Sequence, residues 1–94
     1  MGQRVVRVNE LLMREISNIL HTRYQAETVE TSIVGVDVSP NLRGAKVFFA
    51  THGDAEVRHK AERFFAAHHA HIRRELGRVV TLKYLPHLDF IYDK

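Results

Sequence analysis

Histidines supply the most obvious potential chemistry in this sequence. His68 and His71 stand three residues apart in a helical stretch, with His69 between them, so two imidazoles could bind a metal ion from one helix face. A tetrahedral metal site needs converging ligands beyond these two, and no carboxylate within one turn completes the set. We therefore expect no metal. The histidines either lie on an ordinary helix surface or gain positive charge on mild acidification, which would tighten phosphate binding.

Nucleophilic chemistry has weaker support. Ser39 stands close to Asp37, but nothing in the spacing brings His52 or His87 to them, and a catalytic triad is defined by geometry rather than by sequence distance. The chain has no cysteine, which excludes thiol catalysis, disulfides and iron–sulfur ligation. Ser39-Pro40 is therefore interpreted as loop chemistry, and we expect neither enzymatic activity nor a cofactor.

Positive charge is concentrated in the second half of the chain. The 94 residues carry a formal net charge of +3, yet the segment from Arg58 to Lys83 holds seven Lys and Arg against two Glu. Arg74 and Arg78 are four residues apart and share one helix face. Such a surface favours a polyanionic partner, because one guanidinium group can bind two phosphate oxygens at once. A solubilising helix surface and a contact with an acidic protein partner remain alternatives.

The elements that must position these groups follow from hydrophobic periodicity. The chain length fits a single domain over residues 1–94. Apolar positions predict a helix over residues 5–24, strands over 29–38 and 45–51, a helical region capped by Asp54, and a strand over 80–92 interrupted at Pro86. Nothing resembles a signal peptide or a membrane span, so we expect a cytoplasmic protein without membrane contact.

The helical region after Asp54 contains two apolar stripes, one ending at Phe65 and one starting at Ile72. Residues 66–71 between them fit one long helix or a bent pair equally well. With the pair counted as two helices, the order is α-β-β-α-α-β, and the fold class is α+β. The simplest architecture that buries these apolar faces is a three-stranded sheet with the helices on one face. Its last strand follows a long crossover and could therefore run parallel to a strand of the preceding hairpin.

Turn and aromatic residues complete the description. Ser39 to Gly44 joins the two hairpin strands, with Pro40 fixing one φ and Asn41 and Gly44 tolerating unusual ones. Arg43 leaves this turn, where it could contact phosphate or pair with Asp37. Most aromatic residues follow helix or strand periods and are expected in the core or on a sheet face, whereas Tyr24 and Tyr84 are the expected exposed aromatics.

Four stretches of the sequence resemble the signature stretches of bacterial ribosome-binding factor A, in the same order and over nearly the whole chain. They are RVVRVNELLMREI (residues 4–16), VDVSPNLRGAKV (36–47), IRRELG (72–77) and LKYLPHLDFIYD (82–93). The resemblance implies a type II KH-like fold and a non-catalytic factor that binds the free small ribosomal subunit and its 16S ribosomal RNA during late maturation and rRNA processing. We expect a monomer.

Two features qualify this expectation. An Ala-x-Gly interruption commonly separates the two C-terminal helices of the family, and this sequence has His68, His69 and Ala70 at the aligned helix junction. Ordinary KH domains clamp single strands with a Gly-x-x-Gly loop, and no two glycines here are three residues apart. RNA contact should therefore depend on charge and shape. The residues expected to bind RNA are Arg4, Arg7, Arg14, Arg43, Lys46, Arg63, Arg73, Arg74, Arg78 and Lys83.

Overall fold

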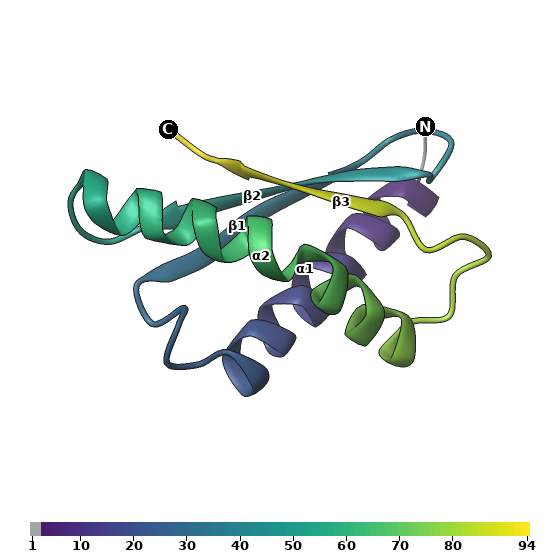
Figure 1. Ribbon diagram of the computed structural model, residues 1–94. Coiled ribbons are helices and arrows are strands. Elements are labelled where there is room, and N and C mark those ends of the chain that lie inside the picture. Colours follow the sequence, from purple (N-terminus) through teal and green to yellow (C-terminus); the bar gives the residue numbers. More distant parts are fainter. Residues whose placement is uncertain (1–2) are drawn as a thin grey trace.

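The chain forms a layer of two helices against one face of a three-stranded sheet (Figure 1). A computed structural model describes residues 3–94. Its elements are α1 (Gln3–Arg23), β1 (Thr31–Val38), β2 (Gly44–Thr51), α2 (Ala55–Val79) and β3 (His87–Tyr92). The predicted α+β class and the arrangement of helices on one face of the sheet are confirmed. No helix in the described part of the chain is both long and apolar enough to cross a membrane.

The sheet has β2 in its centre. β2 pairs antiparallel with β1, as the hairpin prediction required, and parallel with β3, as the long crossover allowed. Ala45, Val47 and Phe49 of β2 point toward the helices and are buried, while Lys46 between them is exposed on the outer face. The sheet therefore has one covered face and one solvent face.

The core lies between the sheet and the two helices. Leu12 and Ile16 of α1 and Ile72 and Leu76 of α2 have no exposed surface, and they pack with Val47 of the central strand. Burial of each such side chain stabilises the fold by about 1.5–3 kcal/mol. These residues fix the positions of both helices relative to the sheet, and hence of the polar groups at their ends.

The helical region is one continuous helix. Of the two alternatives for residues 66–71, the structure has the single helix, so no break occurs at the predicted junction of His68, His69 and Ala70. The physical reason is local: the alanines of this stretch are strong helix formers and it contains no glycine or proline. The His68 ring also packs 5.1 Å from the Tyr24 ring and 4.6 Å from the Phe64 ring, centroid to centroid, which ties the middle of α2 to the end of α1.

The start of α2 is as predicted. The Asp54 carboxylate accepts hydrogen bonds from the backbone N–H groups of Glu56 (3.1 Å) and Val57 (3.2 Å). These contacts satisfy donors that the first helical turn otherwise leaves without partners. Asp54 is therefore the N-cap of α2.

Residues 80–86 do not form the predicted first half of the last strand. β3 begins only at His87, whose N–H donates to the Arg43 carbonyl, and the preceding segment is an irregular connection. The Arg73 side chain holds this connection against α2, since its Nη2 donates to the Leu85 carbonyl (2.7 Å) and its Nε to the Pro86 carbonyl (3.0 Å). Gly77 lets it approach the helix closely, because an added Cβ would lie 3.1 Å from Leu85 Cδ2.

Candidate nucleic-acid interface

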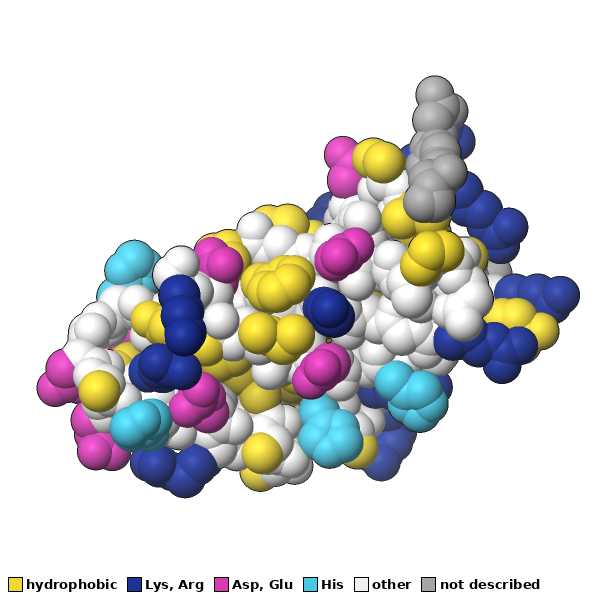
Figure 2. Space-filling model, turned by 90° about the horizontal axis from the view of Figure 1, so that it is seen from above, with side chains coloured by type: hydrophobic (Ala, Val, Ile, Leu, Met, Phe, Trp, Pro, Cys, Tyr) yellow, Lys and Arg dark blue, Asp and Glu magenta, His cyan; other side chains and the backbone are white. Residues whose placement is uncertain are grey.

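One end of the molecule brings three separate segments together. The first turns of α1, the turn between β1 and β2, and the connection from α2 to β3 all lie at the right of Figure 1. Figure 2 shows Lys and Arg side chains at this same right-hand end with no acidic side chain among them, whereas in the middle and at the left of that face Lys and Arg side chains lie among acidic ones. We call Arg4, Arg43, Lys83 and the Tyr84 ring the basic end.

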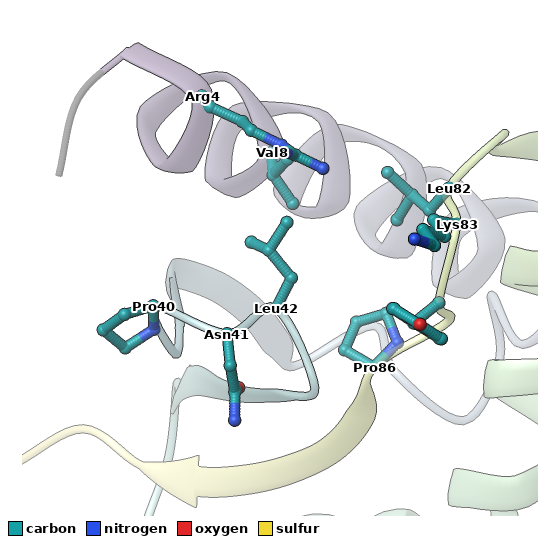
Figure 3. A pocket seen from close by; sticks show the side chains of 9 residues that line it. Arg4, Val8, Pro40, Asn41, Leu42, Leu82, Lys83 and Pro86 are labelled. Atoms are coloured by element: carbon teal, nitrogen blue, oxygen red, sulfur yellow. The ribbon is translucent and has the colours of Figure 1, made fainter.

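A cavity of about 260 Å³ opens within the basic end (Figure 3). It is lined from α1, from the β1–β2 turn and from the connection, by Arg4, Val8, Pro40, Asn41, Leu42, Leu82, Lys83, Tyr84 and Pro86. Leu42 points from the turn toward Val8 of α1, and Leu82 and Lys83 come from the opposite side. The cavity therefore has apolar walls and positively charged side chains among its lining residues.

Tyr84 is the aromatic residue of this cavity. Its ring has Arg43 Cζ at 4.0 Å and Lys83 Nζ at 5.5 Å from the ring centroid, and 43% of the residue is exposed. Cations over an aromatic face are attracted by its quadrupole, so the ring holds both charges close to the cavity. The prediction of an exposed aromatic is confirmed for Tyr84.

The β1–β2 turn is fixed by its own side chains. The Ser39 hydroxyl donates to Asn41 Oδ1 (2.7 Å) and accepts from the Gly44 N–H (3.2 Å), and Asn41 Oδ1 also accepts from the Arg43 N–H (3.0 Å). The positive φ of this turn belongs to Leu42 at +62° and not to Asn41 or Gly44, whose residue types tolerate such a conformation. The Leu42 side chain packs against the core, which offsets the steric cost.

Three of the predicted RNA contacts stand apart from the basic end, and each has a carboxylate beside it. Arg14 Nε lies 3.4 Å from Glu15 Oε2, and Arg63 Nη2 lies 3.8 Å from Glu56 Oε1. Lys46, on the outer face of the sheet, pairs in register with Asp37 on one side and Asp89 on the other. Their positive charge is partly balanced by the protein itself.

The other predicted contacts differ in their surroundings. Arg7 is exposed on α1, one turn after Arg4. Arg73 is half-buried and donates to the connection, whereas its neighbour Arg74 is exposed. Arg78 is exposed with its Nε 3.7 Å from Glu75 Oε2. Of this group, Arg7 and Arg74 present the most accessible charge.

Glu75 is a buried carboxylate beside two arginines and a histidine, which the sequence did not reveal. Its side chain is 10% exposed, with Arg23 Nη2 at 3.2 Å from Oε1 and Arg78 Nε and His71 Nε2 at 3.7 and 3.8 Å from Oε2. His71 Nδ1 is in turn hydrogen-bonded to the Tyr24 hydroxyl. This network joins the end of α1 to the C-terminal part of α2.

Tyr24 is buried rather than exposed, so that prediction was wrong. Its ring packs edge-on against Phe64 and His71, both from α2, with centroids 5.1 and 5.8 Å away. Burial raises the pKa of Tyr24 above its usual value, and the Glu75 carboxylate adds to the effect. Within residues 3–94 no group of three His, Asp or Glu side chains is placed to hold a metal ion.

Sequence reasoning missed the apolar walls of the cavity. Leu42 and Pro86 lie within the recognised sequence stretches, but their residue types alone indicate only packing and turns. The available signal was the placement of Lys83-Tyr84 and Arg43 next to apolar residues at two turns, which is typical of a surface that combines charge with stacking.

Element order and sheet topology define this protein as a KH-like α+β domain, with a cavity and a cluster of positive charge at one end. The family model for ribosome-binding factor A matches residues 4–94. The chain is 43% identical over 93 residues to ribosome-binding factor A of Opitutus terrae, covering 99% of this chain and 76% of that protein. It is 37% identical to the Synechococcus sp. protein of that name, covering 99% of this chain and 67% of the relative. The chain belongs to the ribosome-binding factor A family.

Solved structures share the fold. The crystal structure of ribosome-binding factor A from Thermus thermophilus superimposes with a TM-score of 0.82 at 17% identity, over 98% of this chain and 97% of that chain. A homology model of the Thermus thermophilus factor, fitted into the cryo-EM map of a 30S–RbfA complex, gives a TM-score of 0.71 at 18% identity over 86% of each chain. At these identities the likeness establishes the fold alone.

Proposed function

We propose that this protein is a non-catalytic assembly factor that binds the free small ribosomal subunit during late maturation and rRNA processing, with its basic end on 16S ribosomal RNA. It acts as a monomer in the cytoplasm. Family membership supports the ribosomal partner, as does the fitting of a relative of the same fold into the map of a 30S complex. The observation that carries the choice of surface is that Arg4 and Lys83 line one cavity and that Arg43 lies over the ring of Tyr84, which lines it too.

Charge balance supports the basic end over Arg14, Lys46 and Arg63, each of which has a carboxylate beside it. Arg14 and Arg63 have carboxylates within 3.4 and 3.8 Å, whereas none of the described residues that line the basic-end cavity is acidic. A phosphate approaching the cavity meets positive charge that the protein does not itself neutralise, and release of counterions from RNA then drives binding. Shape and charge replace the absent Gly-x-x-Gly clamp.

Cosedimentation with purified small subunits at low salt tests the proposal. We expect Arg43→Glu combined with Lys83→Glu to weaken binding by at least about tenfold, because two phosphate contacts become repulsive. Arg14→Glu combined with Arg63→Glu makes the same change in net charge and serves as the matched control, with a smaller loss. Equal losses in the two double variants would refute the choice of surface.

Nuclease treatment separates RNA contact from contact with an acidic protein. We expect digestion of the ribosomal RNA to abolish capture by the immobilised factor. Capture of ribosomal proteins that persists after complete digestion would instead support the protein-interaction module.

A further inference from the structure

We propose that the cavity of the basic end binds one unpaired RNA nucleotide, with its base between the apolar walls and Tyr84 and its phosphate on Arg4 and Lys83. The proposal rests on the proposed function, since ribosomal RNA would supply the nucleotide. It adds a single-base contact to a surface that otherwise recognises charge and shape.

The lining of the cavity selects this class of ligand. Val8, Leu42 and Leu82 offer apolar surface, which inorganic phosphate alone would leave without a contact. Arg4 and Lys83 offer positive charge, which a purely apolar molecule would leave without a partner. A nucleotide has both a flat, weakly polar base and an anionic phosphate, and aromatic side chains are the usual partners of unstacked bases.

The size of the cavity limits the ligand to one base. Its volume of about 260 Å³ lies just below the range of ~300–1,000 Å³ that is typical of sites for drug-sized molecules. A base that is paired and stacked within a helix presents only its edges in the grooves, so its flat face cannot contact the walls of the cavity. The nucleotide must therefore come from a loop, a bulge or a strand end, where bases are free to turn outward.

The cavity is built before any ligand arrives. Hydrogen bonds of Ser39 and Asn41 fix the turn that carries Leu42, and Leu42 is held at a φ of +62°. The opposite wall is held by Arg73 through the carbonyls of Leu85 and Pro86. A strained backbone supported on both sides is a feature of binding sites, and prior ordering of the walls lowers the entropy lost when a ligand binds.

Oligonucleotide binding by Tyr84 variants tests the assignment. The probes are fluorescent pentaadenylate and a blunt RNA duplex, and the variants are Tyr84→Leu, which removes the aromatic face, and Tyr84→Phe, which keeps it. We expect Tyr84→Leu to weaken pentaadenylate binding by about 5- to 150-fold and to leave duplex binding within about twofold. Tyr84→Phe should bind both probes as the unmodified protein does. Because Tyr84 is 43% exposed, the variants should keep the fold, which circular dichroism checks.

Nuclear magnetic resonance locates the site independently. Adenosine monophosphate should shift the signals of Leu42, Leu82 and Tyr84, while inorganic phosphate alone should shift only the cationic side chains. Pentaadenylate binding that is unaffected by Tyr84→Leu, or an absence of shifts at Leu42 and Leu82, would overturn the proposal. Tighter binding of adenosine monophosphate than of pentaadenylate would identify a free nucleotide as the ligand and would also overturn the assignment to RNA.

Small-subunit binding distinguishes this proposal from the one on which it rests. If the unmodified protein fails to bind purified small subunits, the proposed function is wrong. If it binds them and Tyr84→Leu binds equally well, only the nucleotide site is wrong.

Discussion

Arg73 and Arg74 are adjacent arginines of α2 for which the structure predicts opposite effects. Arg73 donates to the Leu85 and Pro86 carbonyls at 2.7 and 3.0 Å, while Arg74 is exposed on the helix surface. A hydrogen bond from a charged donor contributes about 1.5–3 kcal/mol when buried. The half-buried position of Arg73 reduces this, so we expect Arg73→Ala to lower the free energy of unfolding by about 2 kcal/mol in total.

Thermal and urea unfolding followed by circular dichroism measure this difference. For a domain of this size, a loss of about 2 kcal/mol lowers Tm by about 8–16 °C. Arg74→Ala is the matched control, and it should change the free energy of unfolding by less than about 0.5 kcal/mol, since it removes an exposed side chain from a helix. Equal destabilisation by the two variants would refute the reasoning that Arg73 holds the connection to β3.

Three further predictions concern stability. Glu75→Gln should lower the free energy of unfolding by about 1–2 kcal/mol, because it removes the buried carboxylate but leaves arginines that reach solvent. Glu62 is the control, since its side chain is 41% exposed, and Glu62→Gln should lower the free energy of unfolding by less than about 0.5 kcal/mol. Urea midpoints that show the reverse order would contradict this prediction. Folding raises the pKa of Tyr24 above its usual value of 10.0. The contribution of Tyr24 to the free energy of unfolding is therefore fully present below about pH 10 and is lost as the pH rises from there through the folded-state pKa. In Tyr24→Phe this alkaline loss should be shallower, and an unchanged slope would rule out Tyr24 as its source. Asp54→Ala should cost about 1 kcal/mol by loss of the N-cap and Asp54→Asn only a few tenths, whereas equal thermal midpoints for both variants would exclude the capping role.

The regular elements were predictable from local pattern. Leu12 and Ile16 follow a helical spacing, Val47 and Phe49 a strand spacing, and Asp54 a capping position. Each pattern reflects the regular geometry of one element, which sets the side chains that share a face. Their order also indicated the layered architecture, since a helix and a sheet with one apolar face each must cover one another.

Contacts between distant segments were not predictable. Tyr24 follows a helix end and should have been exposed, but α2 residues some forty positions later cover its ring. Residues 80–86 contain strand-forming types, yet hydrogen bonds from Arg73 and the close approach at Gly77 hold them as an irregular connection. The cavity depends on three segments meeting, so neither its walls nor the different roles of Arg73 and Arg74 could be predicted from composition.

The salt dependence of small-subunit binding tests the central claim most directly. The affinity is measured at several potassium chloride concentrations for the unmodified protein and for Arg43→Gln combined with Lys83→Gln. If both side chains bind phosphates, the slope of log K against log salt should become shallower by about 1.4–1.8, at roughly 0.7–0.9 for each lost contact. Arg14→Gln combined with Arg63→Gln should leave the slope unchanged. A slope that is unaltered in the first variant and shallower in the second would contradict the assignment of the RNA surface to the basic end.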